Sequence, residues 1–386
     1  MSTVYVFGAG ASRDAGYPLA SAMGSELFAY MLKSENVWIR ASAEFLIDTF
    51  GATPNIEDLI TKIESQVAKL KNSEVPEDRI QRSRIANRRV YLGVALQEWF
   101  RQIHLLPAPS YATFAEHIVR PGDVVVTFNY DDSLERELRR FGKWDISRGY
   151  GFPLGTEEIP SDVMVLKLHG SVNWLVSLFG GATGGAFLVN PASSMGNHPV
   201  IHRADLEFLG YEAFAGHTYQ SGGAFPCLIL PGRSKEFFYD TSFGHEFGNF
   251  WDHLWSRAAG ALRAADEIVV CGYSLPGADQ RARDLLFQQP QRNAVIQVIS
   301  GDQSERIARE FSSAGFESVS TFTGGYFANW CQAQQKSSDA ATRAEMLATV
   351  AASVRKHASG ETIERPVNRQ PLPLNSEANN DDQEND

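Results

Sequence analysis

Four short strings of polar or glycine-rich residues each directly follow a run of apolar, strand-forming residues. These strings are 8–12 (GAGAS), 129–132 (NYDD), 169–173 (HGSVN) and 272–279 (GYSLPGAD). The glycines of the first string let the backbone turn tightly and bring N–H groups against a phosphate. An amide such as Asn129 can orient a water or a hydroxyl group, and a neutral histidine such as His169 can accept its proton. Together the strings indicate a site for a phosphate-bearing ligand, most naturally a dinucleotide.

Each string also has a purely structural interpretation. The first is an imperfect match to a dinucleotide-binding loop, because Arg13 stands where a third glycine is usual, and such strings arise by chance. His169 would then be a histidine with its hydrogen bonds satisfied at a strand end. Asn129 and Asp279 would cap the helices that follow them. Any one string alone leaves both interpretations open.

The apolar runs that precede the strings predict the strands of a buried parallel sheet. Strands are expected at 4–7, 123–128, 163–168, 267–271 and 294–299, with an edge strand at 319–322. Helical spacing of apolar residues is found at 19–32, 42–50, 55–70, 82–106, 133–141, 250–265 and 281–288. Alternating strands and helices predict an α/β fold, a Rossmann-like doubly wound parallel sheet, whose ligands bind at the carboxyl ends of the strands.

Composition suggests how the chain is divided. We expect one α/β domain over 1–335, carrying a helical insertion at 19–118 and an irregular insertion at 175–250 that is rich in Gly, Phe and Pro. The helical insertion would serve as a lid or an oligomerisation surface without chemistry of its own. A C-terminal helix is expected over 336–358. The segment 359–386 is predicted to be a disordered tail, because it has too few apolar residues to offset chain entropy.

Charge and cysteine content restrict the function classes. The net charge of −11 argues against a broad nucleic-acid-binding face, which needs clustered Lys and Arg. Cys227, Cys271 and Cys331 lie far apart and form no CxxC pair, so neither a four-thiolate zinc site nor a disulfide framework is expected. No apolar run is long enough to span a bilayer. We therefore expect a cytoplasmic protein without metal, membrane contact or direct nucleic-acid binding.

In this order, each after an apolar run, the four strings resemble those of the sirtuin superfamily, and more narrowly its sirtuin-like bacterial defence branch. The resemblance covers roughly 3–327 and implies NAD as the ligand. It assigns Asn129 and Asp131 to the nicotinamide pocket and His169 to the role of general base at the nicotinamide ribose. The remaining implied NAD-binding residues are Gly8, Ala9, Gly10, Ala11 and Ser12 at the pyrophosphate, Asp14 and Gly16 at the nicotinamide ribose, Gly272 and Ser274 at the phosphates and adenosine ribose, Asp302 at the adenosine ribose hydroxyls, and Asp279.

The chain departs from the protein-deacylating sirtuins, which carry two CxxC pairs on a zinc module after the histidine. Only the half that binds and breaks NAD is left, so the resemblance implies an NAD glycohydrolase with Asn129 and His169 as its catalytic pair. In the defence branch, such an enzyme depletes NAD in a phage-infected cell. An unregulated enzyme would be toxic, so control by assembly is expected. The chain resembles the subunit that works with a HerA-type hexameric ATPase, and a homo-oligomer is expected, with 19–118 as the candidate assembly surface.

Two other functions remain open. An NAD-dependent protein deacylase or ADP-ribosyltransferase is disfavoured by the missing zinc cysteines. A non-catalytic sensor of NAD or ADP-ribose is disfavoured by the presence of both Asn129 and His169, because a sensor needs no base at the ribose.

Overall fold

The computed structural model describes residues 2–52, 55–71, 73–152, 161–177, 186–189, 202–204, 224–230, 244–277 and 279–358. The chain forms two compact units, Met1–Lys336 and Ser337–Asp386. The predicted disordered tail at 359–386 and most of the predicted irregular insertion at 175–250 lie outside the described residues.

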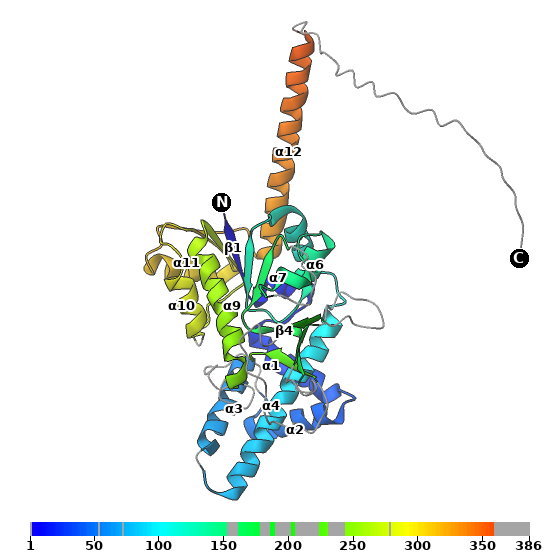
Figure 1. Cartoon of the computed structure of the whole chain (residues 1–386), viewed down its shortest axis with the longest axis vertical. Helices are drawn as coiled ribbons and strands as arrows, with labels where there is room; N and C mark the ends of the chain where they lie inside the picture. The colour runs from blue at the N-terminus through cyan, green and yellow to red at the C-terminus, as the bar shows by residue number, and fades with distance from the viewer. Residues whose placement is uncertain are drawn as a thin grey trace, which may run out of the picture. The chain divides into compact units, whose positions relative to one another are not determined.

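A six-stranded sheet with the order β10-β9-β8-β1-β2-β3 forms the core of the first unit (Figure 1). Its strands are β1 (Thr3–Phe7), β2 (Val124–Thr127), β3 (Met164–Lys167), β8 (Glu267–Cys271), β9 (Val295–Ile299) and β10 (Ser318–Thr321). All neighbours pair in parallel, and Val4 of β1 lies between Val124 and Ile268. Val4, Val6 and Phe7 are fully buried, as expected for a strand covered on both faces. The predicted α/β, Rossmann-like sheet is thus confirmed.

The strand order places the topological switch point beside β1. From β1 the chain moves to β2 and β3 on one side, and it later returns to β8 on the other side. The loops that leave the carboxyl ends of β1 and β8 therefore diverge and open a crevice, where α/β sheets of this kind bind ligands. These loops carry the first and fourth strings of the sequence.

Helices surround the sheet in the alternating pattern that the sequence predicted. They are η1 (Ala9–Ala15, a 3₁₀ helix), α5 (Pro109–Thr113), η2 (Phe114–Ile118, a π-helix), α6 (Ser133–Arg140), α7 (Ile146–Gly149), α9 (Gly244–Ala264), α10 (Gln280–Gln288), η4 (Gly301–Gln303) and α11 (Ser304–Ser313). The last helix, α12 (Phe327–Ala358), begins in the first unit and includes the first residues of the second. Helix α12 begins earlier than the apolar pattern suggested, because Phe327 packs 5.1 Å from Phe7, ring centre to ring centre.

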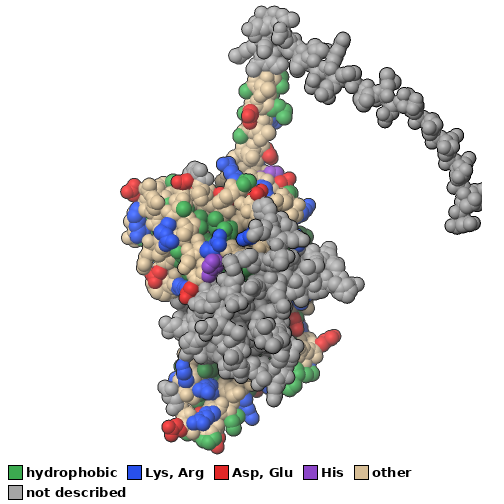
Figure 2. Space-filling model, in the orientation of Figure 1, with side chains coloured by type: hydrophobic (Ala, Val, Ile, Leu, Met, Phe, Trp, Pro, Cys, Tyr) green, Lys and Arg blue, Asp and Glu red, His purple; other side chains and the backbone are tan. Residues whose placement is uncertain are grey.

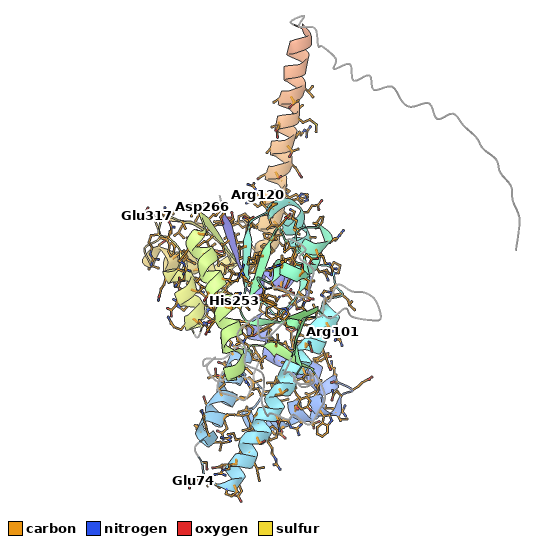
Figure 3. The ribbon with its side chains drawn as sticks, in the orientation of Figure 1. Glu74, Arg101, Arg120, His253, Asp266 and Glu317 are labelled. Atoms are coloured by element: carbon orange, nitrogen blue, oxygen red, sulfur yellow. The ribbon has the colours of Figure 1, made fainter. Side chains whose placement is uncertain are left out.

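The segment between β1 and β2 is largely helical, as predicted. It contains α1 (Ala20–Lys33), α2 (Val37–Phe50), α3 (Ile56–Lys71) and α4 (Pro76–Ile103). Helix α4 starts before the predicted residue 82, since Pro76, Glu77 and Asp78 suit a first turn although they add nothing to the apolar face. Asp266 and Glu317, which directly precede β8 and β10, lie at one end of this unit, and Glu74 between α3 and α4 lies at the other (Figure 3). The insertion therefore lies toward the carboxyl ends of the strands.

A second sheet, with the order β6-β5-β4-β7 and antiparallel pairs, was not predicted. Its strands are β4 (Gly170–Ser177), β5 (Ala186–Val189), β6 (His202–Ala204) and β7 (Ala224–Leu228). Most of the third string is thus a strand. Its polar residues Ser171 and Asn173 are buried because they donate hydrogen bonds to the Tyr130 carbonyl (3.2 Å) and the Tyr150 hydroxyl (2.9 Å).

Two further properties concern membrane-spanning helices and the distribution of surface charge. Among the described residues, no helix combines the length and the apolar character that crossing a membrane requires. On the face shown in Figure 2, Lys and Arg side chains are interspersed with Asp and Glu side chains.

Candidate functional site

A cavity of about 650 Å³ opens at the carboxyl ends of β1, β2, β8 and β9. All four strings contribute to its wall, and Asp302 joins them from the segment after β9. The predicted site residues that line the cavity are Gly8, Ala9, Gly10, Ser12, Asn129, Asp131, His169, Gly272, Ser274, Asp279 and Asp302. Residues far apart in the sequence thus meet at the crevice that the sheet topology creates.

The glycine-rich loops after β1 and β8 pack backbone against backbone. The Gly10 N–H donates to the Gly272 carbonyl (2.9 Å), and the Gly8 N–H donates to the Cys271 carbonyl (3.0 Å). A Cβ on Gly8 would lie 2.5 Å from the Tyr273 Cα. Gly272 has φ +62°, and a Cβ there would lie 2.3 Å from the Ala11 nitrogen. These contacts require glycine at both positions, whether or not a ligand binds.

The same packing limits which amides of the first loop a ligand can reach. The Gly10 N–H is bonded to Gly272, and the Ala11 N–H donates to the Gly8 carbonyl (2.9 Å). The Ala9 N–H has no acceptor within the part of the chain that the structure describes, and Ala9 lines the cavity. Of the amides of Ala9, Gly10 and Ala11 at the start of η1, Ala9 is therefore the one that can bind a phosphate oxygen.

The Asn129 side chain is held by a buried network of hydrogen bonds. Its Nδ2 donates to the Gly8 carbonyl and to Ser12 Oγ, both at 2.9 Å, and lies 3.4 Å from the Tyr111 hydroxyl. Ser12 Oγ in turn donates to Asp131 Oδ2 (2.7 Å) and lies 2.8 Å from the Tyr111 hydroxyl. Since the amide nitrogen is committed to the protein, Oδ1 is the atom that Asn129 can offer to a ligand in the cavity.

His169 lies at the end of β3 and is paired with Asp279. Its Nε2 is 3.3 Å from Asp279 Oδ2, and both side chains are buried. The other carboxylate oxygen, Oδ1, accepts from the Ala282 N–H (3.2 Å), so Asp279 also caps α10. The structural interpretation of Asp279 as a helix cap is therefore confirmed, and its contact with His169 is a second role that was not predicted. Because an ionised carboxylate only accepts, the Nε2 that faces Asp279 carries a proton.

An aromatic pair forms the wall beside the histidine. The rings of Phe128 and Tyr273 are stacked, with centres 4.3 Å apart, and Phe128 lies 5.0 Å from the His169 ring. The Tyr273 hydroxyl donates to Asp279 Oδ2 (3.3 Å). Phe128 and Tyr273 both line the cavity, so its histidine end is largely apolar.

A buried group of charges underlies the second string. Lys167 Nζ is 2.9 Å from Glu135 Oε1 and donates to the main-chain carbonyl of Asp131. Burial raises the pKa of the Asp131 and Glu135 carboxyls, although the Lys167 ammonium opposes that rise. Nearby, His104 Nδ1 lies 2.8 Å from Asp132 Oδ1. Lys167 thus holds the segment after β2, which carries Asn129.

Three predicted site residues do not line the cavity. Ala11 is buried behind the loop, where its amide bonds Gly8. The Asp14 carboxylate accepts from the N–H and the hydroxyl of Ser110. Gly16 ends η1 with φ +91°. In this structure, all three have structural roles in the first loop.

Several cavity residues were not identified from the sequence. Arg13 lines the cavity and lies over the Tyr326 ring, 5.4 Å from its centre. The sequence did contain a signal for this residue, because a cation in place of the third glycine of the loop can bind a phosphate. The helical insertion also supplies part of the wall, which the expectation of a surface without chemistry did not foresee; its lining residues are Leu19, Ala20, Ser21, Met23, Asn55, Ile56, Glu57 and Phe100. Within the described residues, no group of three or more His, Cys, Asp or Glu side chains is placed to hold a metal ion.

Comparisons with known proteins give little further guidance. No protein-family model matches the chain, and no curated protein matches it. Among solved structures, the chain is similar to one described by the words "Structural Basis for the Mechanism and Regulation of Sir2 Enzymes". The identity is 13%, the match covers 87% of this chain and 92% of the other, and the TM-score is 0.37. The similarity is too loose to transfer a function, so the function has to be inferred from the motifs and the geometry of the site.

Proposed function

We propose that the protein is an NAD glycohydrolase, which cleaves the bond between nicotinamide and ribose and releases nicotinamide and ADP-ribose. One observation carries the proposal: the Asp279-paired His169 and the Asn129 amide line the same cavity as the glycine-rich loop at the switch point of the sheet. The four strings that resemble those of NAD-cleaving sirtuin-like proteins are the ones that meet there.

His169 is suited to remove the proton from the attacking group. In the reaction a water oxygen bonds to C1′ of the ribose, while the glycosidic bond breaks and its electron pair neutralises the pyridinium nitrogen. The proton of the water passes to the His169 imidazole, directly or through a ribose hydroxyl. The Asp279 carboxylate, 3.3 Å from Nε2, stabilises the imidazolium that forms. No further charged group is needed, because the leaving pyridinium already carries the positive charge.

Asn129 is suited to hold the attacking water or a ribose hydroxyl. Its Oδ1 accepts a hydrogen bond without placing a net charge beside the oxocarbenium-like centre. The stacked Phe128 and Tyr273 rings offer an apolar wall for the pyridine ring and limit water at that end of the cavity.

The opposite end of the cavity suits the ADP half. The Arg13 guanidinium and the Ala9 N–H supply a cation and a hydrogen-bond donor for phosphate oxygens. Asp302, which follows β9, lines the cavity, and its carboxylate is suited to accept from ribose hydroxyls. Ser274 adds a hydroxyl to the same wall.

We extend the proposal to bacterial defence against phage, in which the enzyme would deplete NAD in the infected cell. This step is supported by the resemblance of the four strings. Control by a homo-oligomer or a HerA-type hexameric ATPase would keep the activity silent otherwise. The helical insertion is the proposed assembly surface, and its exposed Val37 and Trp38, 57% and 58% exposed, are the kind of side chain that a partner covers.

The test is NAD consumption by the purified full-length chain, alone and with a HerA-type ATPase, with the products identified by chromatography. Asn129→Ala and His169→Ala should fold, as judged by circular dichroism, and release no nicotinamide. His253→Ala is the matched control, because His253 lies on α9 outside the cavity (Figure 3). Binding of NAD without turnover in both settings would replace the hydrolase by a sensor. Turnover that requires an acylated peptide would replace it by a deacylase.

A further inference from the structure

Among the described residues, Tyr111 is the one hydrogen-bond partner of the Asn129 side chain that comes from outside the four strings. It lies on α5, near the end of the helical insertion at 19–118, and is fully buried among aromatic rings, with its ring centre 5.8 Å from that of Phe7 and 5.8 Å from that of Phe327. Its hydroxyl is 2.8 Å from Ser12 Oγ and 3.4 Å from Asn129 Nδ2. The apolar packing fixes the ring, so the hydroxyl is delivered to one place.

The hydrogen bonds around Ser12 have a direction that follows from the donor inventory. A hydroxyl can donate one hydrogen bond. Ser12 donates its hydrogen bond to the Asp131 carboxylate, which when ionised can only accept. Ser12 must then accept from both of its other neighbours, the Asn129 amide and the Tyr111 hydroxyl. The Tyr111 hydroxyl thus donates to Ser12 Oγ, and Ser12 Oγ donates to the Asp131 carboxylate.

This direction determines how the Asn129 amide is turned. The Gly8 carbonyl is an obligatory acceptor, and Ser12 has no proton left to donate, so both face the NH₂ end of the amide. If the Tyr111 hydroxyl were lost, Ser12 would lose one donor and the buried amide would lose one of the groups that hold its NH₂ end. A buried network that is only partly satisfied no longer specifies one arrangement.

We propose that Tyr111 is a positioning residue: through Ser12 it fixes the rotamer of Asn129 so that Oδ1, rather than Nδ2, is presented to the ligand in the cavity. This inference rests on the proposed function where activity is the readout, because Asn129 is assigned there to the attacking group. The orientation of Asn129 is a property of the protein alone and can be tested separately.

The experiment compares Tyr111→Phe with Tyr5→Phe in the full-length chain. Tyr5 is the matched control, because it is buried, packs against the same Phe7 ring at 6.4 Å, and carries a hydroxyl outside this network. We expect Tyr111→Phe to lower kcat about tenfold with the KM for NAD nearly unchanged, as the loss of one hydrogen bond to the reactive arrangement would. In the Asn129→Ala background, the same change should lower the residual rate no further, since a purely structural loss would be independent of Asn129.

A crystal structure of Tyr111→Phe supplies the readout that does not need activity. We expect the Asn129 side chain to occupy more than one rotamer, whereas the Tyr5→Phe structure should keep the single arrangement. A single unchanged Asn129 rotamer in Tyr111→Phe would overturn the inference even if the wild type proved inert toward NAD. An equal loss of kcat in Tyr5→Phe, or a further loss in the Asn129→Ala background, would overturn it in an active enzyme. Failure of the wild type to cleave NAD would instead count against the proposed function alone.

Discussion

The described residues include two buried histidine–aspartate pairs with different surroundings. His169 and Asp279 approach to 3.3 Å and line the cavity. His104 and Asp132 approach to 2.8 Å, but neither of them lines it; His104 follows the end of α4, and Asp132 precedes α6. The closer pair is thus the one that does not line this cavity. A short contact between a histidine and a carboxylate therefore does not by itself mark a reactive pair, and only the pair beside the cavity is placed for the chemistry that we propose.

The first prediction tests whether the two pairs differ in function, by removing the Asp279 charge while keeping its helix cap. Asparagine caps helices about as well as aspartate, so Asp279→Asn should leave α10 and the fold intact. It removes the carboxylate that orients His169 and stabilises its imidazolium, so we expect kcat for NAD cleavage to fall by about 10²–10⁴-fold.

Asp132→Asn is the matched control for this prediction. It changes the other pair in the same way and should lower stability while leaving kcat nearly unchanged. The two variants are compared by steady-state release of nicotinamide and by urea unfolding. Comparable kcat values for Asp279→Asn and the wild type would show that the pair at the cavity is structural too.

The second prediction concerns the pair outside the cavity. His104→Ala leaves Asp132 buried without its histidine, and breaking a buried ion pair costs about 3 kcal/mol or more. We expect this loss in the free energy of unfolding, measured by urea denaturation, together with nearly unchanged NAD cleavage by the remaining folded protein. Cleavage reduced as strongly as in His169→Ala would contradict the distinction between the pairs.

Much of the main sheet could be predicted from the sequence. The six strands of the main sheet lie close to where continuous apolar runs predicted them, because strands buried on both faces leave a strong local signal. Strand β4 was missed since its polar Ser171 and Asn173 are satisfied by Tyr130 and Tyr150, which only the fold brings near. The start of α12 was missed for a similar reason, because Phe327 packs against the Phe7 ring, which is far away in the sequence.

Most of the residues predicted for the site line one cavity, but the contacts between them were not predicted. Asn129, His169 and Asp279 were recognised as strand-end groups, yet nothing local indicates that His169 meets Asp279 or that Asn129 is held through Ser12. Asp14 shows that a residue close to the glycine loop in sequence need not line the cavity. It is close to the glycine loop along the chain, but its carboxylate accepts from Ser110 and does not line the cavity.

The third prediction uses pH to separate the His104 pair from the rest of the molecule. Burial lowers the pKa of His104, but Asp132 more than offsets this, so the pKa is raised above 6.5. Burial raises the pKa of Asp132, and His104 more than offsets that, so the pKa is lowered below 3.8. The stabilisation by the charged pair is therefore complete between pH 3.8 and pH 6.5. It is lost as pH rises through the folded pKa of His104, and it is lost on the acid side as pH falls through the folded pKa of Asp132.

This dependence is measured as the difference in unfolding free energy between the wild type and His104→Ala. Taking the difference cancels other groups that titrate, among them Asp131 with its raised pKa. The difference should be larger near about pH 6 than near about pH 9. A difference that grows with rising pH would show that His104 is buried neutral and that the pair is not ionic.

The smallest expected effect tests whether the cavity that gives His169 its role also holds the phosphates. Arg13→Ala removes a cation from the wall without touching either pair, and Arg13 is exposed, so the fold should tolerate the change. We expect the KM for NAD to rise about tenfold, as loss of one charge-assisted contact to a phosphate would produce, with kcat nearly unchanged. Arg101→Ala on α4 is the matched control, because Arg101 is also exposed and lies outside the cavity (Figure 3). A fall in kcat with unchanged KM in Arg13→Ala would instead place Arg13 at the reacting end, and the assigned direction of the dinucleotide in the cavity would have to be reversed.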